Sequence, residues 1–267
     1  MIRQLHSEWA RGRGRPVEKF AGAFALLLGL MIPLIMIART AGNQILRTSA
    51  LTSLAFPGSL AGGRAMMTIL GPLFAAAIAS NIVGAEYQYG TWPWLLVRTS
   101  SRTRLLTVKV LVAAARILAI AVAGIALYMT MGALVLAFVG APLTKDIPAA
   151  RFLLVPFIDI AGNMAFVAAV AMTVTLASRS SVFGMLAGVM FVPVLAAIRF
   201  KETAAWIPMV HLQNIEEKLL FHKASPFLAT ALDFHMSGRA SAAVLGAELL
   251  VLLAAAYMIF KRQEIVY

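Results

Sequence analysis

Long apolar runs, separated by shorter polar segments, limit what this chain can fold into. A helix needs about 18 or more mainly apolar residues to cross roughly 30 Å of hydrocarbon at a rise of 1.5 Å per residue. Runs of about this length cover residues 20–38, 65–85, 111–139, 152–177, 182–198 and 241–260. We therefore expect an all-α polytopic membrane protein, with residues 1–267 forming a single transmembrane domain of six transmembrane helices.

Composition agrees with a membrane protein and excludes several other classes. Hydrophobic residues make up 61% of the chain and charged residues 13%, whereas soluble domains average about 45–50% and about 25%. The formal net charge of +12 comes from cations that flank the apolar runs, as anionic lipid and the positive-inside bias favour. We expect contact with membrane lipid and no nucleic-acid partner. The absence of cysteine excludes disulfides, thiolate metal sites and cysteine nucleophiles.

The amino-terminal segment predicts an interfacial helix. Residues 1–19 are rich in arginine, and Ile2, Leu5 and Trp9 share one face of a helix. A secretory signal peptide is disfavoured, because the following apolar run is too long and no small-residue cleavage site follows it. An even number of spans places both termini on one side, and the positive-inside rule makes that side the cytoplasm.

The stretch 200–240 is the longest polar connection, and we expect it on the outer side between spans five and six. Leu212, Ile215 and Leu219 would share one face of a helix, and Pro226 would end it. A short outer helical hairpin is the expected result. The histidines of this stretch match no compact ligand spacing, so we expect no metal site.

Two kinds of residue within the predicted spans call for different explanations. Gly184 and Gly188 form a small-xxx-small pair, for which close helix packing is the expected role. Asp159, Asn163 and Glu248 are costly in hydrocarbon, at about 2.5–3.5 kcal/mol for an ionised group on insertion scales. They would line an outward-facing substrate path or bind protons, or they would be satisfied by arginines near the same interface: Arg151, Arg199 and Arg239.

The chain lacks the sequence motifs of an enzyme. There is no G-x-x-x-x-G-K-[ST] phosphate loop, no H-E-x-x-H, no G-x-S-x-G and no G-x-G-x-x-G. We therefore expect no catalytic residues, no cofactor bound by this chain and no ATP hydrolysis by the chain alone.

A polar, basic and aromatic segment at residues 86–109 separates the second and third predicted spans. It begins with Glu86 and a Gly90–Thr91 step, continues with Trp92 and Trp94, and then carries several cations. Gly90 would allow a sharp change of direction, and tryptophans are typical anchors of protein interfaces. An ordinary positive-inside loop with an aromatic belt would explain the cations and tryptophans, but not their order.

That order resembles the loop between the second and third spans of type-2 ATP-binding-cassette (ABC-2 type) exporter permeases. The residues that carry the resemblance are Glu86, Gly90, Thr91, Leu95, Leu96, Ser101, Arg102 and Lys109. The predicted amino-terminal helix, the six spans and the outer helices are also similar to that family, so the resemblance covers nearly the whole chain.

The resemblance implies that residues 86–109 form a cytoplasmic coupling helix that docks on a separate ABC ATPase subunit, which would bind ATP and Mg. Its contact residues would be Glu86, Gly90, Thr91, Trp92, Trp94, Leu95, Arg98 and Arg102. Glu86 would pair with a nearby cation and hold the helix at a fixed angle. A second permease subunit, identical or different, would complete the pathway in a prokaryotic plasma membrane. The exported substrate would be amphipathic or hydrophobic, such as a lipid, a peptide antibiotic or a drug.

Two other functions fit the sequence. A proton-coupled secondary transporter would use Asp159 and Glu248. A sensor or immunity subunit that works with an ATPase without transporting anything would have the same sequence features.

Overall fold

The computed structural model describes residues 2–12, 16–38, 44–56, 58–98, 101–141, 149–197, 211–212, 215 and 237–263. Within these ranges the regular elements with stated bounds are all α-helices, which confirms the predicted all-α class. They are α1 (Ile2–Gly12), α2 (Pro16–Ala38), α3 (Gln44–Leu54), α4 (Gly58–Gln88), α5 (Trp92–Arg98), α6 (Arg102–Val139), α7 (Ala149–Ser178), α8 (Ser181–Ala197) and α10 (Gly238–Arg262).

Five stretches of the described helices are long and apolar enough to cross a membrane. They are Lys19–Ala38 in α2, Gly58–Gln88, Arg102–Val139, Ala161–Ser178 in α7 and Gly238–Arg262. Each overlaps a predicted span, so the chain is compatible with a multi-pass membrane protein. The remaining predicted span corresponds to α8, whose described apolar stretch, Ser181–Phe191, is shorter. A sixth crossing stays a prediction.

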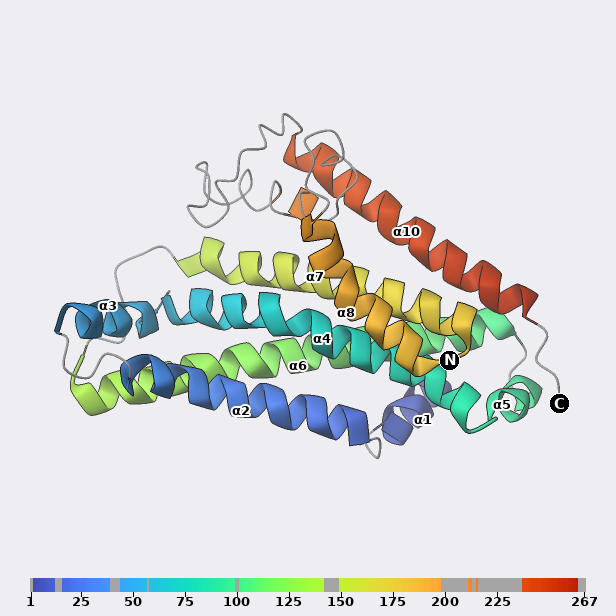
Figure 1. Cartoon of the computed structure of the whole chain (residues 1–267), viewed down its shortest axis with the longest axis horizontal. Coiled ribbons are helices and arrows are strands. Elements are labelled where there is room, and N and C mark those ends of the chain that lie inside the picture. Colours follow the sequence, from blue (N-terminus) through green and yellow to red (C-terminus); the bar gives the residue numbers. More distant parts are fainter. Residues whose placement is uncertain are drawn as a thin grey trace.

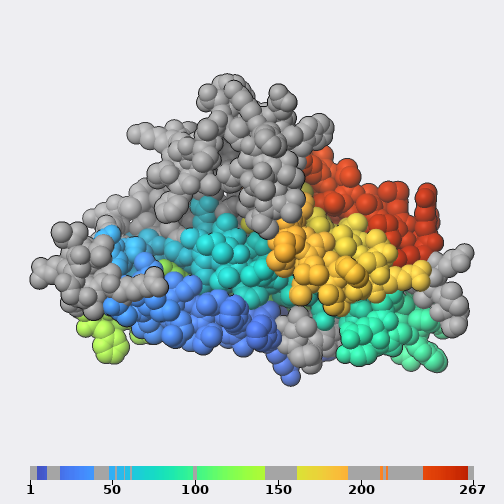
Figure 2. Space-filling model, in the orientation of Figure 1, coloured from blue at the N-terminus to red at the C-terminus, as the bar shows by residue number. Residues whose placement is uncertain are grey.

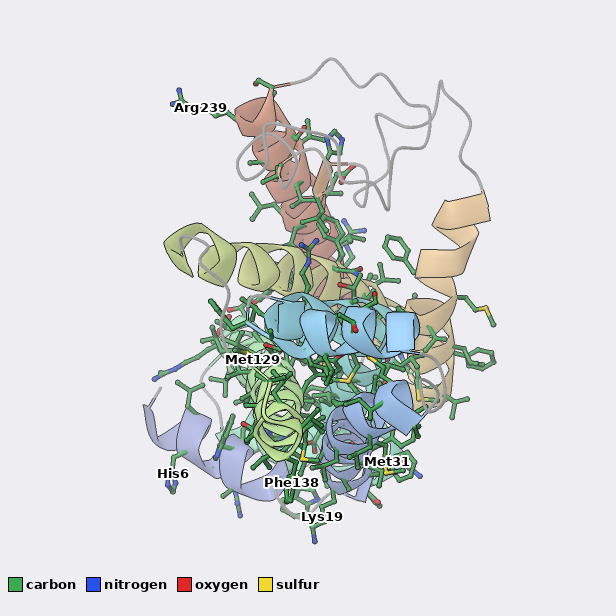
Figure 3. The ribbon with its side chains drawn as sticks, turned by 90° about the vertical axis from the view of Figure 1, so that its left-hand side faces the viewer. His6, Lys19, Met31, Met129, Phe138 and Arg239 are labelled. Atoms are coloured by element: carbon green, nitrogen blue, oxygen red, sulfur yellow. The ribbon has the colours of Figure 1, made fainter. Side chains whose placement is uncertain are left out.

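Helix α4 lies at the centre of the bundle. It packs against α6, α7 and α8 and also contacts α2 and α3, and its membrane-length stretch is the most buried of the five. Viewed end-on, α2 and the carboxyl end of α6, which carries Phe138, lie at one side of the bundle, whereas α7 and then α10 lie at the other (Figure 3). Helices α2, α8 and α10 lie at the surface of the face shown in Figure 2. Both α8 and α10 have exposed apolar side chains, among them Leu186 and Leu250.

Close approach of α8 depends on the two glycines that the sequence marked for packing. A Cβ atom built on Gly184 would lie 2.6 Å from the carbonyl oxygen of Ala171 in α7, and one on Gly188 would lie 2.8 Å from the Cβ of Ala76 in α4. Such separations are too short for real side chains, so the helices approach this closely only because these positions are glycine. The predicted packing role is confirmed.

One end of the bundle gathers segments that are far apart in the sequence. Helices α1 and α5 and the carboxyl end of α10 all lie there, whereas α3 lies at the opposite end (Figure 1). We call this the α5 end. Its predicted orientation towards the cytoplasm stays a prediction. The amino-terminal segment forms two helices rather than one, because α1 ends at Gly12 and α2 already begins at Pro16, where proline suits a helix start.

Only a small part of the predicted outer hairpin falls within the described residues. His211, Leu212 and Ile215 are buried, and a Cβ on Gly162 of α7 would lie 2.4 Å from Leu212 Cδ2. Leu212 and Ile215, which were predicted to share one helix face, therefore both pack inward. Leu219, Pro226 and the rest of the predicted hairpin lie outside the described residues.

Candidate functional site

A tight turn joins α4 to α5 at Gly90, the residue where the sequence predicted a sharp change of direction. Gly90 has a φ of +61°, in the left-handed region that glycine enters without a Cβ clash. The Thr91 N–H donates to the Glu86 carbonyl at 3.0 Å, and the Gly90 N–H donates to the Tyr87 carbonyl at 3.3 Å. This pair of bonds is the Schellman pattern of helix ends. It ends α4 and directs α5 away from the α4 axis.

A buried ion cluster lies directly behind this turn. Lys109 of α6 is fully buried, and its Nζ donates to Glu86 Oε1 at 2.9 Å, to Glu8 Oε2 at 3.3 Å and to the Ile82 carbonyl at 3.2 Å. The Thr91 hydroxyl donates to Glu86 Oε2. The predicted pairing of Glu86 with a nearby cation is confirmed. Moving one of these helices away would leave charged side chains buried without all of their partners, which is costly. The cluster therefore fixes α1, α4 and α6 relative to one another.

A second buried cation fastens α1 to α6. Arg116 donates through Nη2 to the Glu8 carbonyl at 2.9 Å and to the Trp9 carbonyl at 2.7 Å, and its guanidinium lies 5.3 Å from the centroid of the Trp9 ring. These backbone acceptors are near the carboxyl end of α1, where a helix favours positive charge. Helix α1 is therefore bound to the bundle through polar contacts as well as through its apolar face.

Trp92 anchors α5 in the interior. Its side chain is only 2% exposed. The centroid of its ring lies 4.8 Å from the ring centroid of Phe260 in α10 and 5.4 Å from that of Tyr87 in α4. The Lys109 ammonium lies 5.3 Å from the centroid of the same ring, within cation–π range. Trp92 is thus a core residue rather than an exposed partner contact, and it connects α5 directly to α4, α6 and α10.

The opposite face of α5 is exposed. Trp94 and Val97 are each 71% exposed, and Tyr89, before the turn, is 73% exposed. Arg98, the last residue of α5, is exposed as well, whereas Leu95 is buried beside Trp92. Pro93 is the second residue of α5, a position in the first helical turn where proline is tolerated. Of the predicted contact residues, Gly90, Trp94 and Arg98 are exposed, Thr91 and Arg102 are partly exposed, and Glu86, Trp92 and Leu95 are buried. We call Tyr89, Trp94, Val97 and Arg98 the exposed α5 face.

The carboxyl end of α10 is tied to the same region. Arg102 donates through Nη1 to the Gln263 carbonyl at 2.7 Å and lies 3.5 Å from the Lys261 carbonyl. The Gln263 side chain accepts from the Tyr87 hydroxyl and donates to the Leu176 carbonyl of α7. Arg102 therefore holds α10 in place, and its contact with a partner subunit stays a prediction.

The chain matches a known family model over most of its length. The family model DUF2705, described as a protein of unknown function, matches residues 61–266. The chain belongs to the DUF2705 family. A search of curated proteins found no match. The DUF2705 match begins within α4 and includes α5, Lys109, Arg116 and Gln263, whereas Glu8 and the rest of α1 precede it.

Asn163 and Glu248, the two predicted pathway residues whose side chains are described, do not lie at the same level in this DUF2705 chain. Asn163 of α7 is buried, and Glu248 of α10 is half-buried. Because Thr173 donates to the Leu252 carbonyl and so sets the register of the two helices, the rise per residue separates Asn163 from Glu248 by about 9 Å along the bundle. Asp159 lies in α7, but its side chain and the suggested partners Arg151 and Arg199 are outside the described residues. Among the described residues, no group of three or more His, Cys, Asp or Glu side chains is arranged to hold a metal ion.

Sequence reasoning missed three residues that build the site. No role was predicted for Glu8, Arg116 or Gln263. The one available signal was Arg116 itself, because an arginine inside an apolar run is costly and needs a partner.

Proposed function

We propose that this chain is the transmembrane permease subunit of an ATP-driven ABC-2-type exporter, and that α5 is the helix through which a separate ATPase subunit drives it. The observation that carries the proposal is the division of α5 into two faces. Trp92 is buried at 2% exposure, whereas Trp94, two residues later, is 71% exposed. A short helix fixed from behind, with an aromatic side chain facing outward, suits an interface anchor.

The contacts behind α5 supply a route for transmitting movement. Trp92 touches Phe260 of α10 and faces Lys109 of α6, and both helices are membrane-length stretches. Nucleotide-driven closure of two ATPase subunits would push on the exposed α5 face, and these contacts would pass the push to α6 and α10. Two such permease subunits would then open a path for an amphipathic or hydrophobic substrate. ATP and Mg would be bound by the ATPase partner.

A copurification experiment tests the proposal. The chain is coexpressed with the ABC-type ATPase encoded nearest to it, with Trp94→Ala compared against Phe138→Ala, whose side chain is 92% exposed at the opposite end of α6. We expect Trp94→Ala to weaken complex formation about tenfold or more, since central interface aromatics contribute about 2 kcal/mol or more. Phe138→Ala is expected to leave the complex unchanged. Equal recovery of the ATPase with both variants would refute the assignment of α5.

One observation favours a proton-coupled secondary transporter as the second candidate. Glu248 lies within a membrane-length helix, and its Oε2 is a buried atom without a hydrogen-bond partner among the described residues. Such a carboxyl group suits reversible protonation. Transport that continues without ATP, stops when the proton gradient is abolished and is lost in Glu248→Gln would favour this candidate over the exporter.

A further inference from the structure

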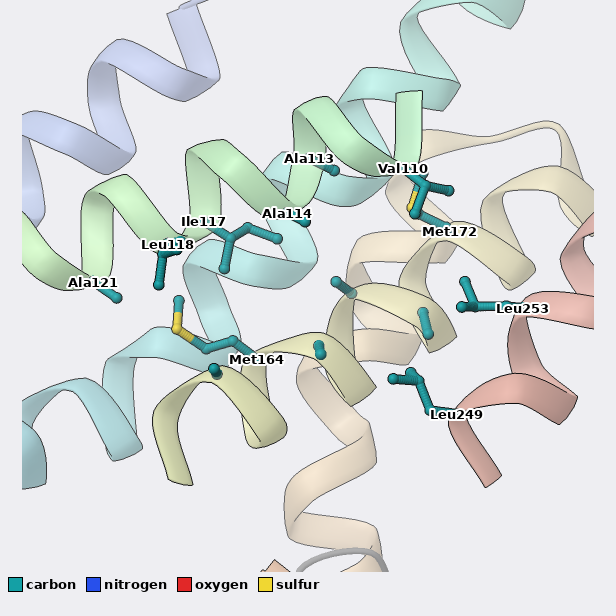
Figure 4. Close-up of a pocket in the computed structure, with 14 residues that line it drawn as sticks. Val110, Ala113, Ala114, Ile117, Leu118, Ala121, Met164, Met172, Leu249 and Leu253 are labelled. Atoms are coloured by element: carbon teal, nitrogen blue, oxygen red, sulfur yellow. The ribbon is translucent and has the colours of Figure 1, made fainter. Parts of the chain in front are cut away.

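An apolar groove lies between α6, α7 and α10. Its volume is about 320 Å³, and every residue that lines it is alanine, valine, isoleucine, leucine or methionine. Ile117 lies on the α6 wall, Met164 and Met172 on the α7 wall, and Leu249 and Leu253 on the α10 wall (Figure 4). A water molecule in such a groove would have no polar partners, so an apolar occupant is favoured.

The groove opens to the surroundings along α6. Ala113 and Ile117, at its floor, are buried, whereas Ala114 and Leu118, which also line it, are exposed. All three walls belong to membrane-length helices. In a membrane the opening would therefore face hydrocarbon, where acyl chains are the abundant apolar molecules.

Its length matches one leaflet. Val110 and Ala121 mark the two ends of the groove on α6 (Figure 4). Eleven steps of helix separate them, which is about 16 Å at the standard rise. That is roughly half of the 30 Å hydrocarbon thickness of a bilayer, so the groove accommodates one chain of one leaflet.

Polar groups and then cations follow at the α5 end of the groove. The hydroxyls of Thr107 in α6 and Tyr257 in α10 lie 2.6 Å apart, just beyond Val110. One helical turn further along each helix are Arg104 and Lys261, both exposed. The order of apolar groove, hydroxyls and cations matches the order of acyl chain, ester and phosphate in a phospholipid. Basic sites of this kind between membrane helices favour anionic headgroups.

We propose that this groove binds one acyl chain of an anionic phospholipid from the leaflet at the α5 end, with the headgroup phosphate on Arg104 and Lys261. The inference rests on the membrane placement that underlies the proposed function, and it needs no ATPase partner. Because Phe260 of α10 packs on Trp92, the same helix that forms one wall of the groove also touches α5.

Photolabelling of the full chain tests the site. The protein is reconstituted in phosphatidylcholine vesicles that contain phosphatidylglycerol with a photoactivatable acyl chain, and labelled peptides are identified by mass spectrometry. Labelling is expected on the groove walls of α6 and α10. Ala114→Phe, which fills the groove from its exposed rim, should reduce this labelling about fivefold. Ala119→Phe, an exposed position on α6 outside the groove, should not, and the thermal melting of both variants verifies folding.

A separate variant tests the contact between the headgroup and the two cations. Arg104→Gln combined with Lys261→Gln should lower the preference for labelled phosphatidylglycerol over labelled phosphatidylcholine about tenfold, since each basic residue near the surface adds to anionic-lipid binding. Arg239→Gln, an exposed cation at the other end of α10, is the control and should leave this preference unchanged. Equal labelling of the wild-type protein by the two lipids would overturn the proposal.

A second copy of the chain is the competing occupant, and the absence of natural cysteine makes it easy to detect. Leu118→Cys introduces a single thiol at the rim of the groove. Disulfide-linked dimers in vesicles, together with the absence of lipid label, would assign the groove to a protein interface and overturn the proposal. Failure of the wild-type chain to copurify the ATPase, with lipid labelling intact, would contradict the exporter alone, whereas copurification of the ATPase without lipid labelling would contradict the lipid site alone.

Discussion

The ammonium group of Lys109 lies 2.9 Å from Glu86 Oε1, with neither side chain more than 5% exposed. Glu8 of α1 completes the cluster at 3.3 Å from the same ammonium. Three helices are therefore joined by one buried cation, at the point where α4 turns into α5.

Replacing Lys109 alone should destabilise the protein strongly. Lys109→Met leaves Glu8 and Glu86 buried without their cation, for which we expect a loss of about 3–5 kcal/mol in the free energy of unfolding. The measurement is thermal or denaturant unfolding of the purified protein in detergent. Adding Glu8→Gln and Glu86→Gln to Lys109→Met should recover much of the loss, because none of these three positions then carries a buried charge. If Lys109→Met alone were as stable as the wild type, the buried ion cluster would not stabilise the protein.

The two tryptophans of α5 should differ in what their removal changes. Trp92→Ala empties a core position between Tyr87 and Phe260 and should cost about 3–5 kcal/mol of stability. Trp94→Ala changes an exposed side chain and should alter stability by about 0.5 kcal/mol or less. Unfolding curves of the two variants, recorded side by side, make the comparison. Similar losses in both would mean that the burial of Trp92 is not what anchors α5.

Alanine at Gly90 should affect both stability and the direction of α5. At a φ of +61° an alanine is strained by about 1–2 kcal/mol, and since a Cβ there would meet no neighbouring atom, the whole cost comes from the backbone. Gly140, at the carboxyl end of α6 with a φ of +69°, is the matched control. Both alanine variants should lose similar stability. Only Gly90→Ala should reduce ATPase copurification, because only that turn positions the exposed α5 face.

Loss of Arg116 should release α1. Arg116→Met removes the donors to the Glu8 and Trp9 carbonyls and the contact with the Trp9 ring. We expect trypsin to cleave after Arg11 at least several-fold faster, as measured by the appearance of the shortened chain under limited proteolysis. Arg239→Met, at an exposed position of α10, should leave the cleavage rate unchanged. An unaltered rate in Arg116→Met would show that other contacts hold α1.

The sequence by itself determined the helical class and the positions of the membrane-length helices. Crossing about 30 Å of hydrocarbon requires long apolar runs whatever their neighbours are, so these runs are visible without a structure. It also determined the Gly90 turn and the need of Glu86 for a cation. A sharp turn requires a residue that tolerates a positive φ, and a carboxylate at a membrane boundary requires a partner of opposite charge.

Only the tertiary structure decided which residues meet. Trp92 and Trp94 have similar surroundings in the sequence, yet packing against α10 buries one and leaves the other exposed. Glu8 lies far from Lys109 along the chain and meets it only because α1 folds back onto α6. The groove between α6, α7 and α10 is likewise invisible in any single run. Burial and cavities depend on how helices approach one another, and that distance is set by all of their contacting side chains together.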